Sequence, residues 1–253
     1  MAKSPGRKTR IFVDEFDFSG RVSAVEIPFE VNVPEVTALS DGGGTFVEGQ
    51  YSVSIVQNGF FDADGAAPPA DLNIDKEMIL DLVSGVDHLV GAYPGASAVP
   101  GAVGYEIQGR PSNEARPVEV AGAILLNVTW KGNGPVVRST VAANGAVIAT
   151  GAVTASNKNV GITIAGERFV AILRVLSVSG TGSITVEVEQ SQNDGSPDTY
   201  TQLLAFTAKT AIGYQRLTTD LATEAWKRVN VTAFSGFTSA TILVVVGKEL
   251  GVT

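Results

Sequence analysis

Strict alternation of apolar and polar residues is the feature of this sequence that most restricts its fold. In residues 183–189, Ile184, Val186 and Val188 alternate with polar side chains, two of which are glutamates. Successive side chains of a β-strand point to opposite faces. The pattern therefore predicts a strand with the three apolar residues on a buried face and both glutamates on the other face.

Turn residues lie on both sides of this predicted strand. Gly180-Thr181-Gly182 precedes it and predicts a turn, and Asn193-Asp194-Gly195 follows it. Glycine accepts the positive φ angles of tight turns, so we expect a hairpin that closes at Asp194-Gly195. Further strand patterns recur about every dozen residues, as in a β-sandwich or barrel. They cover residues 9–18, 21–33, 46–59, 118–130, 169–178, 200–207, 214–217, 226–234 and 241–247.

One segment has a helical period instead. Its apolar residues recur on one stripe of a helix, with Asn73 placed as an N-cap and Gly85 placed just beyond the end. They are Ile74, Met78, Ile79, Leu82 and Val83. The sequence therefore predicts a mostly β protein with one short α-helix.

A cluster of glycine, asparagine and proline at residues 131–135 interrupts the strand pattern. It separates a half that contains the predicted helix from a half that reads as all β. We expect two domains, residues 1–134 and residues 135–253.

The residue inventory excludes several classes of function. The chain has no cysteine and one histidine, which excludes disulfide scaffolds, thiolate metal sites and multi-histidine metal centres. A formal charge of −8 argues against a protein that binds nucleic acid by neutralising phosphates. No apolar segment approaches the roughly 20 residues of a membrane span, and no apolar core of a signal peptide follows the basic residues 1–10. We expect neither a membrane partner nor secretion by a signal peptide.

Three sequence motifs that could suggest catalysis or ligand binding are incomplete. His88 follows Asp87, but neighbours on a strand face opposite ways, so the aspartate cannot orient the histidine. Asp62-x-Asp64-Gly65 lacks the remaining ligands of a calcium loop, and Gly180-Thr181-Gly182 lacks the third glycine and the helix of a phosphate-binding loop. We expect no enzyme activity, no metal and no cofactor.

Several runs of the first half resemble the major tail (tail tube) protein of long-tailed, siphovirus-like bacteriophages. They are residues 16–22, 25–30, 45–55 and 58–62, with the glycine-rich loop between the second and third. Residues 136–139, 169–178, 184–190 and 241–248 are similar to the all-β domain that many tail proteins of actinobacterial phages carry after the tube domain. The resemblance covers nearly the whole chain.

The resemblance implies a tube-building β-sandwich or half-barrel followed by a second β-sandwich. It implies a virion protein, made in the cytoplasm of the host bacterium, that assembles into stacked hexameric rings and forms the conduit through which DNA passes. The implied partners are other copies of the chain, the tape-measure protein, other tail proteins and, transiently and without specificity, DNA.

Candidate site residues follow from this implied role. Glu26, Glu30 and Glu35 are candidates for the tube lumen, where carboxylates would repel phosphates; period two puts Glu26 and Glu30 on one face. They can equally be ordinary solvated positions. Pro28 and Pro34 have no backbone N–H, so they must fall at positions where no ladder hydrogen bond is required. The candidates for contacts between subunits or rings lie in the basic N-terminal arm and the glycine-rich loop. They are Lys3, Arg7, Lys8, Arg10, Asp41, Gly42, Gly43 and Gly44.

A carbohydrate- or receptor-binding β-sandwich module remains an alternative. Its sugar-stacking residues would be the aromatic side chains of the second half, although alternation favours a core position for most of them. These are Tyr200, Tyr214, Trp226, Phe234 and Phe237.

Overall fold

The computed structural model describes residues 9–31, 51–60, 85–95, 98–115, 125–153 and 156–249. Over these residues the protein is built from antiparallel strands and one 3₁₀ turn, η2 (Ser19–Arg21). The mostly β class predicted from the sequence is confirmed. The α-helix expected near residues 74–83 lies outside the described residues.

The chain divides into two compact units. Unit 1 combines Met1–Gly20, Leu89–Glu106 and Pro135–Thr253, and unit 2 combines Arg21–His88 and Ile107–Gly134. One boundary between the units falls between Gly134 and Pro135, and two earlier segments also belong to unit 1. Strand pairing joins these segments across long distances in sequence, which residue composition does not reveal. The division into domains 1–134 and 135–253 stays a prediction.

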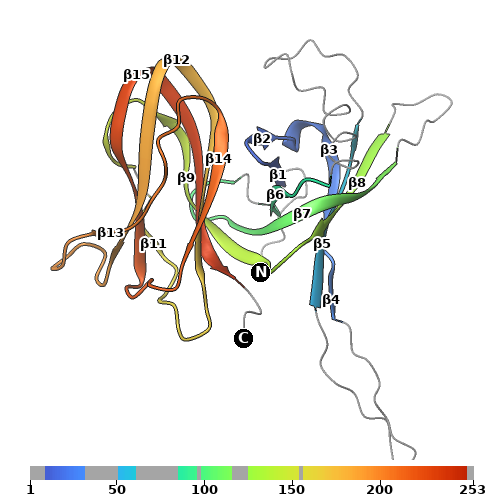
Figure 1. Cartoon of the computed structure of the whole chain (residues 1–253), viewed down its shortest axis with the longest axis horizontal. Helices are drawn as coiled ribbons and strands as arrows, with labels where there is room; N and C mark the ends of the chain where they lie inside the picture. Colours follow the sequence, from blue (N-terminus) through green and yellow to red (C-terminus); the bar gives the residue numbers. More distant parts are fainter. Residues whose placement is uncertain are drawn as a thin grey trace, which may run out of the picture. The chain divides into compact units, whose positions relative to one another are not determined.

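Two unusually long strands organise unit 1. Strands β12 (Phe169–Ser191) and β15 (Trp226–Glu249) pair antiparallel from Phe169↔Lys248 to Ser191↔Trp226 and form one continuous ribbon. The prediction of a turn at residues 180–182 is therefore wrong, because β12 continues through these residues with shifts of register. Figure 1 shows the ribbon arching over at its upper end.

Glycines make the arch possible. Gly180 and Gly236 have φ angles of 90° and 75°, a region that side-chain-bearing residues rarely adopt. A Cβ at Gly236 would overlap the carbonyl oxygen of Thr181, so the two strands approach too closely for any other residue. Glycine thus serves here as a bulge within a strand rather than as the end of one.

The two halves of the ribbon belong to two layers. The first half of β12 pairs with β14 (Gly213–Thr219), and the facing part of β15 pairs with β9 (Val137–Val147). The second half of β12 pairs with β13 (Thr201–Ala205), and β15 there pairs with β10 (Gly151–Ala152) and β11 (Lys158–Asn159). The antiparallel β12–β13 pair, joined through Asp194 and Gly195, confirms the predicted hairpin.

One apolar cluster joins both halves of the ribbon. It includes Leu173 and Val244 from the first half and Ile184, Val186 and Val188 from the second, all fully buried. The predicted buried face of residues 183–189 is confirmed. Because one continuous ribbon lines both sides of this core, it forms a sandwich whose two layers share their central strands.

The sheet continues past β9 and curls back. The order runs β9, β7 (Val103–Ala115), β6 (His88–Tyr93), β1 (Arg10–Val13) and β2 (Phe16–Asp17). Phe12 and Tyr93 nevertheless pack in one cluster with Ile172 of β12 and Leu243 of β15. Strands that are distant in the sheet order can meet only if the sheet curls, so this part of unit 1 is a half-barrel.

Unit 2 is a smaller antiparallel sheet. β3 (Val22–Glu26) and β4 (Phe29–Val31) both pair with β5 (Tyr51–Phe60), β5 pairs with β8 (Leu125–Gly132), and β8 pairs with the end of β7. Pro28 lies between β3 and β4 and breaks the edge strand, as its missing N–H predicts. Its carbonyl still accepts a hydrogen bond from the Ser54 N–H at 3.2 Å. Pro34 lies outside the described residues.

Candidate assembly surfaces

A buried ion pair fixes the turn between β1 and β2 in unit 1. Arg174 of β12 and Glu106 of β7 are both buried, with Nη2 to Oε2 at 2.8 Å and Nη1 to Oε1 at 3.2 Å. The guanidinium also donates to the carbonyl oxygens of Asp14 at 2.6 Å and Leu89 at 3.2 Å. Tyr93 donates its hydroxyl to Glu106. The network satisfies a charge that would otherwise be costly to bury, and it holds the turn at Asp14 in place.

Electrostatics within this network favour the charged arginine. Burial, the largest single influence, would lower the pKa of Arg174, but Glu106, Tyr93 and Asp14 together outweigh it and raise the pKa. Burial and the Glu106 carboxylate raise the pKa of Tyr93, so its phenol stays a hydrogen-bond donor. The turn is therefore held by a permanently charged group.

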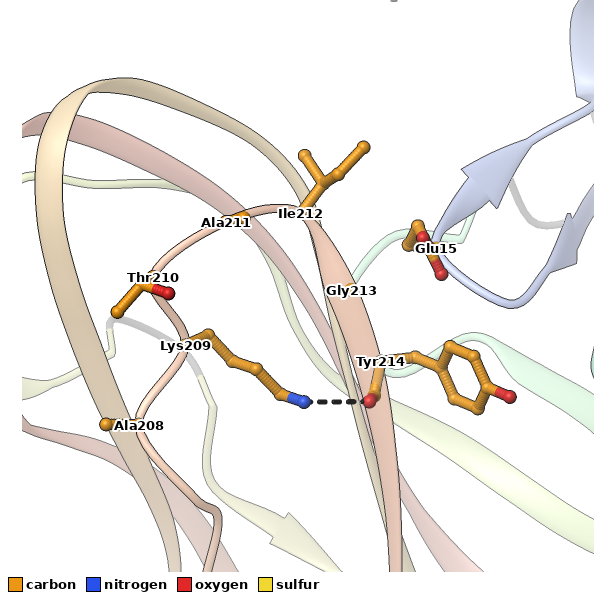
Figure 2. A pocket seen from close by; sticks show the side chains of 8 residues that line it. All are labelled: Glu15, Ala208, Lys209, Thr210, Ala211, Ile212, Gly213 and Tyr214. Carbon is orange, nitrogen blue, oxygen red and sulfur yellow. Dashed lines mark hydrogen bonds between the residues drawn. The ribbon is translucent and has the colours of Figure 1, made fainter. Parts of the chain in front are cut away.

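The held turn forms one wall of a pocket in unit 1. Glu15 of the turn faces the segment that leads into β14, and the pocket between them has a volume of about 370 Å³ and opens to solvent. Figure 2 shows Glu15 on one side and Lys209 on another, with the Lys209 ammonium donating to the Tyr214 carbonyl at 2.9 Å. The remaining lining residues are Ala208, Thr210, Ala211, Ile212 and Gly213.

The Glu15 carboxyl is partly desolvated. Burial raises its pKa, and the neighbouring Asp14 adds to this, while Lys209 and Arg174 act in the opposite direction. No ion pair of Glu15 occurs among the residues that the structure describes. The pocket thus holds a carboxylate that has lost part of its hydration without gaining a cation at contact distance.

A second surface is the open face of the sheet in unit 2. Glu26 lies opposite Val56 and Glu30 lies opposite Ser52, two β5 residues that are four positions apart. Cross-strand partners share a face, so both glutamates lie on the same side of the sheet, as their spacing predicts. The opposite face of β5 is the buried one and carries Val53, Ile55 and Gln57.

This open face also carries cations. Lys131 of β8 lies opposite Ser54, and Arg110 of β7 lies opposite Lys131. Asp87 accepts a hydrogen bond from Arg110 and another from Asn133 at 3.0 Å, and the first of these contacts is the main cause of its lowered pKa. Glu26 and Glu30 are exposed.

Most of the other candidates for assembly contacts lie outside the described residues. These are Glu35, Lys3, Arg7, Lys8, Asp41, Gly42, Gly43 and Gly44. Arg10 is described: it begins β1 and forms an exposed ion pair with Asp17 at 3.4 Å. Its charge is therefore already matched within its own hairpin.

The residues weighed for catalysis and metal binding occupy structural positions or lie outside the described chain. His88 is buried and packs edge-on against Trp130, with ring centroids 5.5 Å apart. Asp62, Asp64 and Gly65 are outside the described residues. Across the described ranges, no group of three acidic, histidine or cysteine side chains could hold a metal ion.

The aromatic residues of the sugar-binding alternative are all at least partly buried. Phe237 belongs to the core of the sandwich, and Phe234 and Tyr214 pack against the two clusters. The Tyr200 ring is covered by the Arg228 guanidinium, 4.0 Å from the ring centroid, and Tyr200 donates to Asp194 at 2.5 Å. Trp226 is half-buried at the start of β15. These positions suit packing better than an open stacking platform.

Sequence reasoning did not single out Glu15 or Arg174. Arg174 is a single charge in an apolar strand pattern, and Glu15 is one of three acidic residues between positions 14 and 17. Glu106, which pairs with Arg174, and Lys209, which lines the same pocket as Glu15, both lie far away in sequence. No local pattern predicts these contacts.

Comparisons with known proteins give structural similarities at low identity. No protein-family model and no curated protein matches the chain. A chain of the "Virion of native gene transfer agent (GTA) particle" aligns at 15% identity over 53% of this chain and 97% of its own, with a TM-score of 0.38. The SPP1 Dit (gp 19.1) protein, described as a paradigm of hub adsorption apparatus in phages that infect Gram-positive bacteria, aligns at 11% identity over 96% and 99%, with a TM-score of 0.37.

The anti-feeding prophage cap aligns at 9% identity over 54% of this chain and 90% of its own, with a TM-score of 0.39. With TM-scores below 0.5, we base neither a family nor a function on these similarities. In the described part of the chain, no helix is long and apolar enough to cross a membrane.

Proposed function

We propose that this chain is a non-enzymatic structural protein of a phage tail, which assembles into stacked hexameric rings and forms the tail tube. The proposal starts from the sequence resemblance to tail tube proteins at residues 16–22, 25–30, 45–55 and 58–62. It places the protein in the virion, after synthesis in the cytoplasm of the host bacterium. Its partners would be further copies of itself, the tape-measure protein and other tail proteins.

The observation that carries the proposal is the strand order of unit 2. Among the residues that the structure describes, β3 and β4 form one margin of its sheet, and the end of β7 forms the other. Each neighbouring pair is antiparallel, so β3 and β4 run in the opposite direction to β7. A second copy related by rotation about a ring axis would therefore bring its β7 alongside β3 and β4 in antiparallel orientation.

Such a contact repeats head to tail. One margin of each copy meets the other margin of the next, which is the kind of interface that closes into a ring. Unpaired strand margins are a liability in a monomer, whereas here they would supply backbone hydrogen bonds between subunits. Open sheets would then join into a continuous wall.

The open face of that sheet would line the lumen. It carries the exposed carboxylates of Glu26 and Glu30 and the exposed ammonium of Lys131, while the charge of its Arg110 is matched by Asp87. Carboxylates repel DNA phosphates, so DNA would pass without sticking. Glu35 belongs to the same proposed set.

The proposal also gives a role to each of the two predicted domains, to the N-terminal arm and to the glycine-rich loop. Residues 1–134 would contain the tube-building sheet, which is that of unit 2, and residues 135–253 would form most of a β-sandwich displayed on the tail exterior. The basic arm (Lys3, Arg7, Lys8 and Arg10) and the loop Asp41–Gly44 would make contacts between subunits or rings.

Electron microscopy of the purified protein at high concentration tests the proposal. We expect rings or tubes with six-fold symmetry, and a protein that stays monomeric under all conditions would contradict it. Ala24→Pro in β3 should block assembly, because a proline ring obstructs strand addition at that margin. Ala152→Pro, in the exposed short strand β10 of unit 1, is the matched control and should still assemble.

A further inference from the structure

The pocket beside the β1–β2 turn carries a charge pattern that the proposed tube does not use. Its Glu15 carboxylate is half-buried and has no ion pair among the described residues. Lys209, on another side, already donates to the Tyr214 carbonyl. Placing an unmatched carboxylate in a partly dehydrated site costs free energy that an incoming cation would offset.

The geometry of the pocket suits a long side chain. Its volume of about 370 Å³ exceeds that of one lysine or arginine, and it opens to solvent. The wall that bears Glu15 is held by Arg174 through the Asp14 carbonyl, so the carboxylate is presented from a fixed turn. A flexible surface glutamate would lose more side-chain entropy on forming an ion pair.

The chain itself contains a suitable donor. Residues 1–10 include Lys3, Arg7, Lys8 and Arg10 without any acidic residue, in a protein whose formal charge is −8. Arg10 is matched by Asp17. Lys3, Arg7 and Lys8 are the other three cations of the arm.

Strand β1 separates the arm of the same copy from the turn that bears Glu15. β1 runs away from the arm for about 10 Å, at about 3.3 Å per residue, before it reaches the turn that bears Glu15. The arm of the same copy would have to reverse and run back along β1. In the proposed stack of rings, a neighbouring copy would offer a second arm, for which this constraint does not apply.

We propose that the Glu15 pocket receives a lysine or arginine side chain from the N-terminal arm of a second copy of this chain. The inference rests on the proposed tail-tube function, because a stack of rings brings the arm of one copy to its neighbour. The pocket then acts as the receiving half of an inter-ring contact, and Lys3, Arg7 and Lys8 are its candidate ligands.

Binding of the arm as a peptide is the first test. A fluorescein-labelled peptide of residues 1–10 is titrated with the chain lacking residues 2–8, at low ionic strength, and the anisotropy is measured. Glu15→Gln should bind about fivefold to tenfold more weakly, as expected for a partly desolvated ion pair. Asp220→Asn, which removes an equal charge from an exposed position of unit 1, should bind as the parent does. Equal affinity for the parent and Glu15→Gln overturns the proposal, and so does an equal loss in both variants.

Cross-linking of the full chain tests which copy supplies the arm. A carbodiimide activates the Glu15 carboxyl. The neutral amine of a lysine that lies in contact with it then displaces the urea and forms an amide. We expect a covalent dimer whose linked peptides contain Glu15 and either Lys3 or Lys8, and no such dimer with Glu15→Gln. A link from Glu15 to its own arm, found only in monomers, overturns the assignment to a second copy.

The experiments can refute the pocket contact and the tail-tube function independently of each other. If rings and tubes form but arm binding does not depend on Glu15, the pocket assignment is wrong and the tail-tube function stands. If the arm peptide binds through Glu15 but the full chain never assembles, the tail-tube function is wrong and the pocket contact stands.

Discussion

The ion pair between Arg174 and Glu106 gives the sharpest test of how unit 1 is held together. Glu106→Gln keeps the size of the side chain but removes its negative charge, so the buried guanidinium loses its counter-charge. Arg174 keeps its bonds to the Asp14 and Leu89 carbonyls, which do not neutralise it. Breaking a buried pair by removing one partner costs about 3 to 5 kcal/mol.

That cost corresponds to a fall in Tm of about 6 to 20 °C, at about 2 to 4 °C per kcal/mol for a chain of this size. Urea and thermal unfolding followed by circular dichroism measure it. Glu167→Gln is the control, because its ion pair with Lys248 is partly exposed to solvent, and its effect should be much smaller. The double variant Glu106→Leu with Arg174→Met should recover most of the loss, since no charge is then buried.

If Glu106→Gln is no more destabilising than Glu167→Gln, the pair does not hold the β1–β2 turn. The reasoning would also fail if the double variant were as unstable as Glu106→Gln. In that case packing, and not charge, would determine stability at this position.

Three further predictions follow from the fold and from the charged groups. Gly236→Ala should lower the free energy of unfolding by about 1 to 3 kcal/mol because of its φ of 75°, whereas Gly20→Ala, with open space around it, should change it by less than about 0.5 kcal/mol in urea titrations. Burial lowers the pKa of Lys227 to about 8 from the usual 10.5, so the unfolded chain binds more protons above pH 8 and stability should rise between pH 8 and about 9.5. Lys227→Met should remove this rise, and an unchanged slope in urea titrations across these pH values would disprove it. Reversing Glu26 and Glu30 to lysine should make assembled tubes retain DNA in a salt-dependent way in co-sedimentation, and unchanged retention would mean that this face does not meet DNA.

Sequence patterns predicted the local features of the fold well. The alternation at Ile184, Val186 and Val188 gave the correct buried face, because period two is enforced by the backbone itself. The hairpin at Asp194-Gly195 and the strand break at Pro28 also followed from backbone chemistry. These signals depend only on residues close together in sequence.

Features that depend on distant residues were not predictable. The glycines at residues 180–182 read as a turn because their effect depends on Gly236, which allows the partner strand to approach. β6, β7 and β9 were missed because their buried faces are short or rich in alanine and glycine and match no clear period. The same limit applies to the pocket, since Glu15 and Lys209 line it together although they are far apart in the sequence.

The β12–β15 ribbon has a mechanical consequence. Because each strand passes through both layers, no layer can detach while the other stays intact. A pull on this part of the molecule along the strands would load many backbone hydrogen bonds at once, in shear, instead of opening them one by one. An assembly that must withstand internal pressure and sudden release would benefit from a part that yields only as a whole.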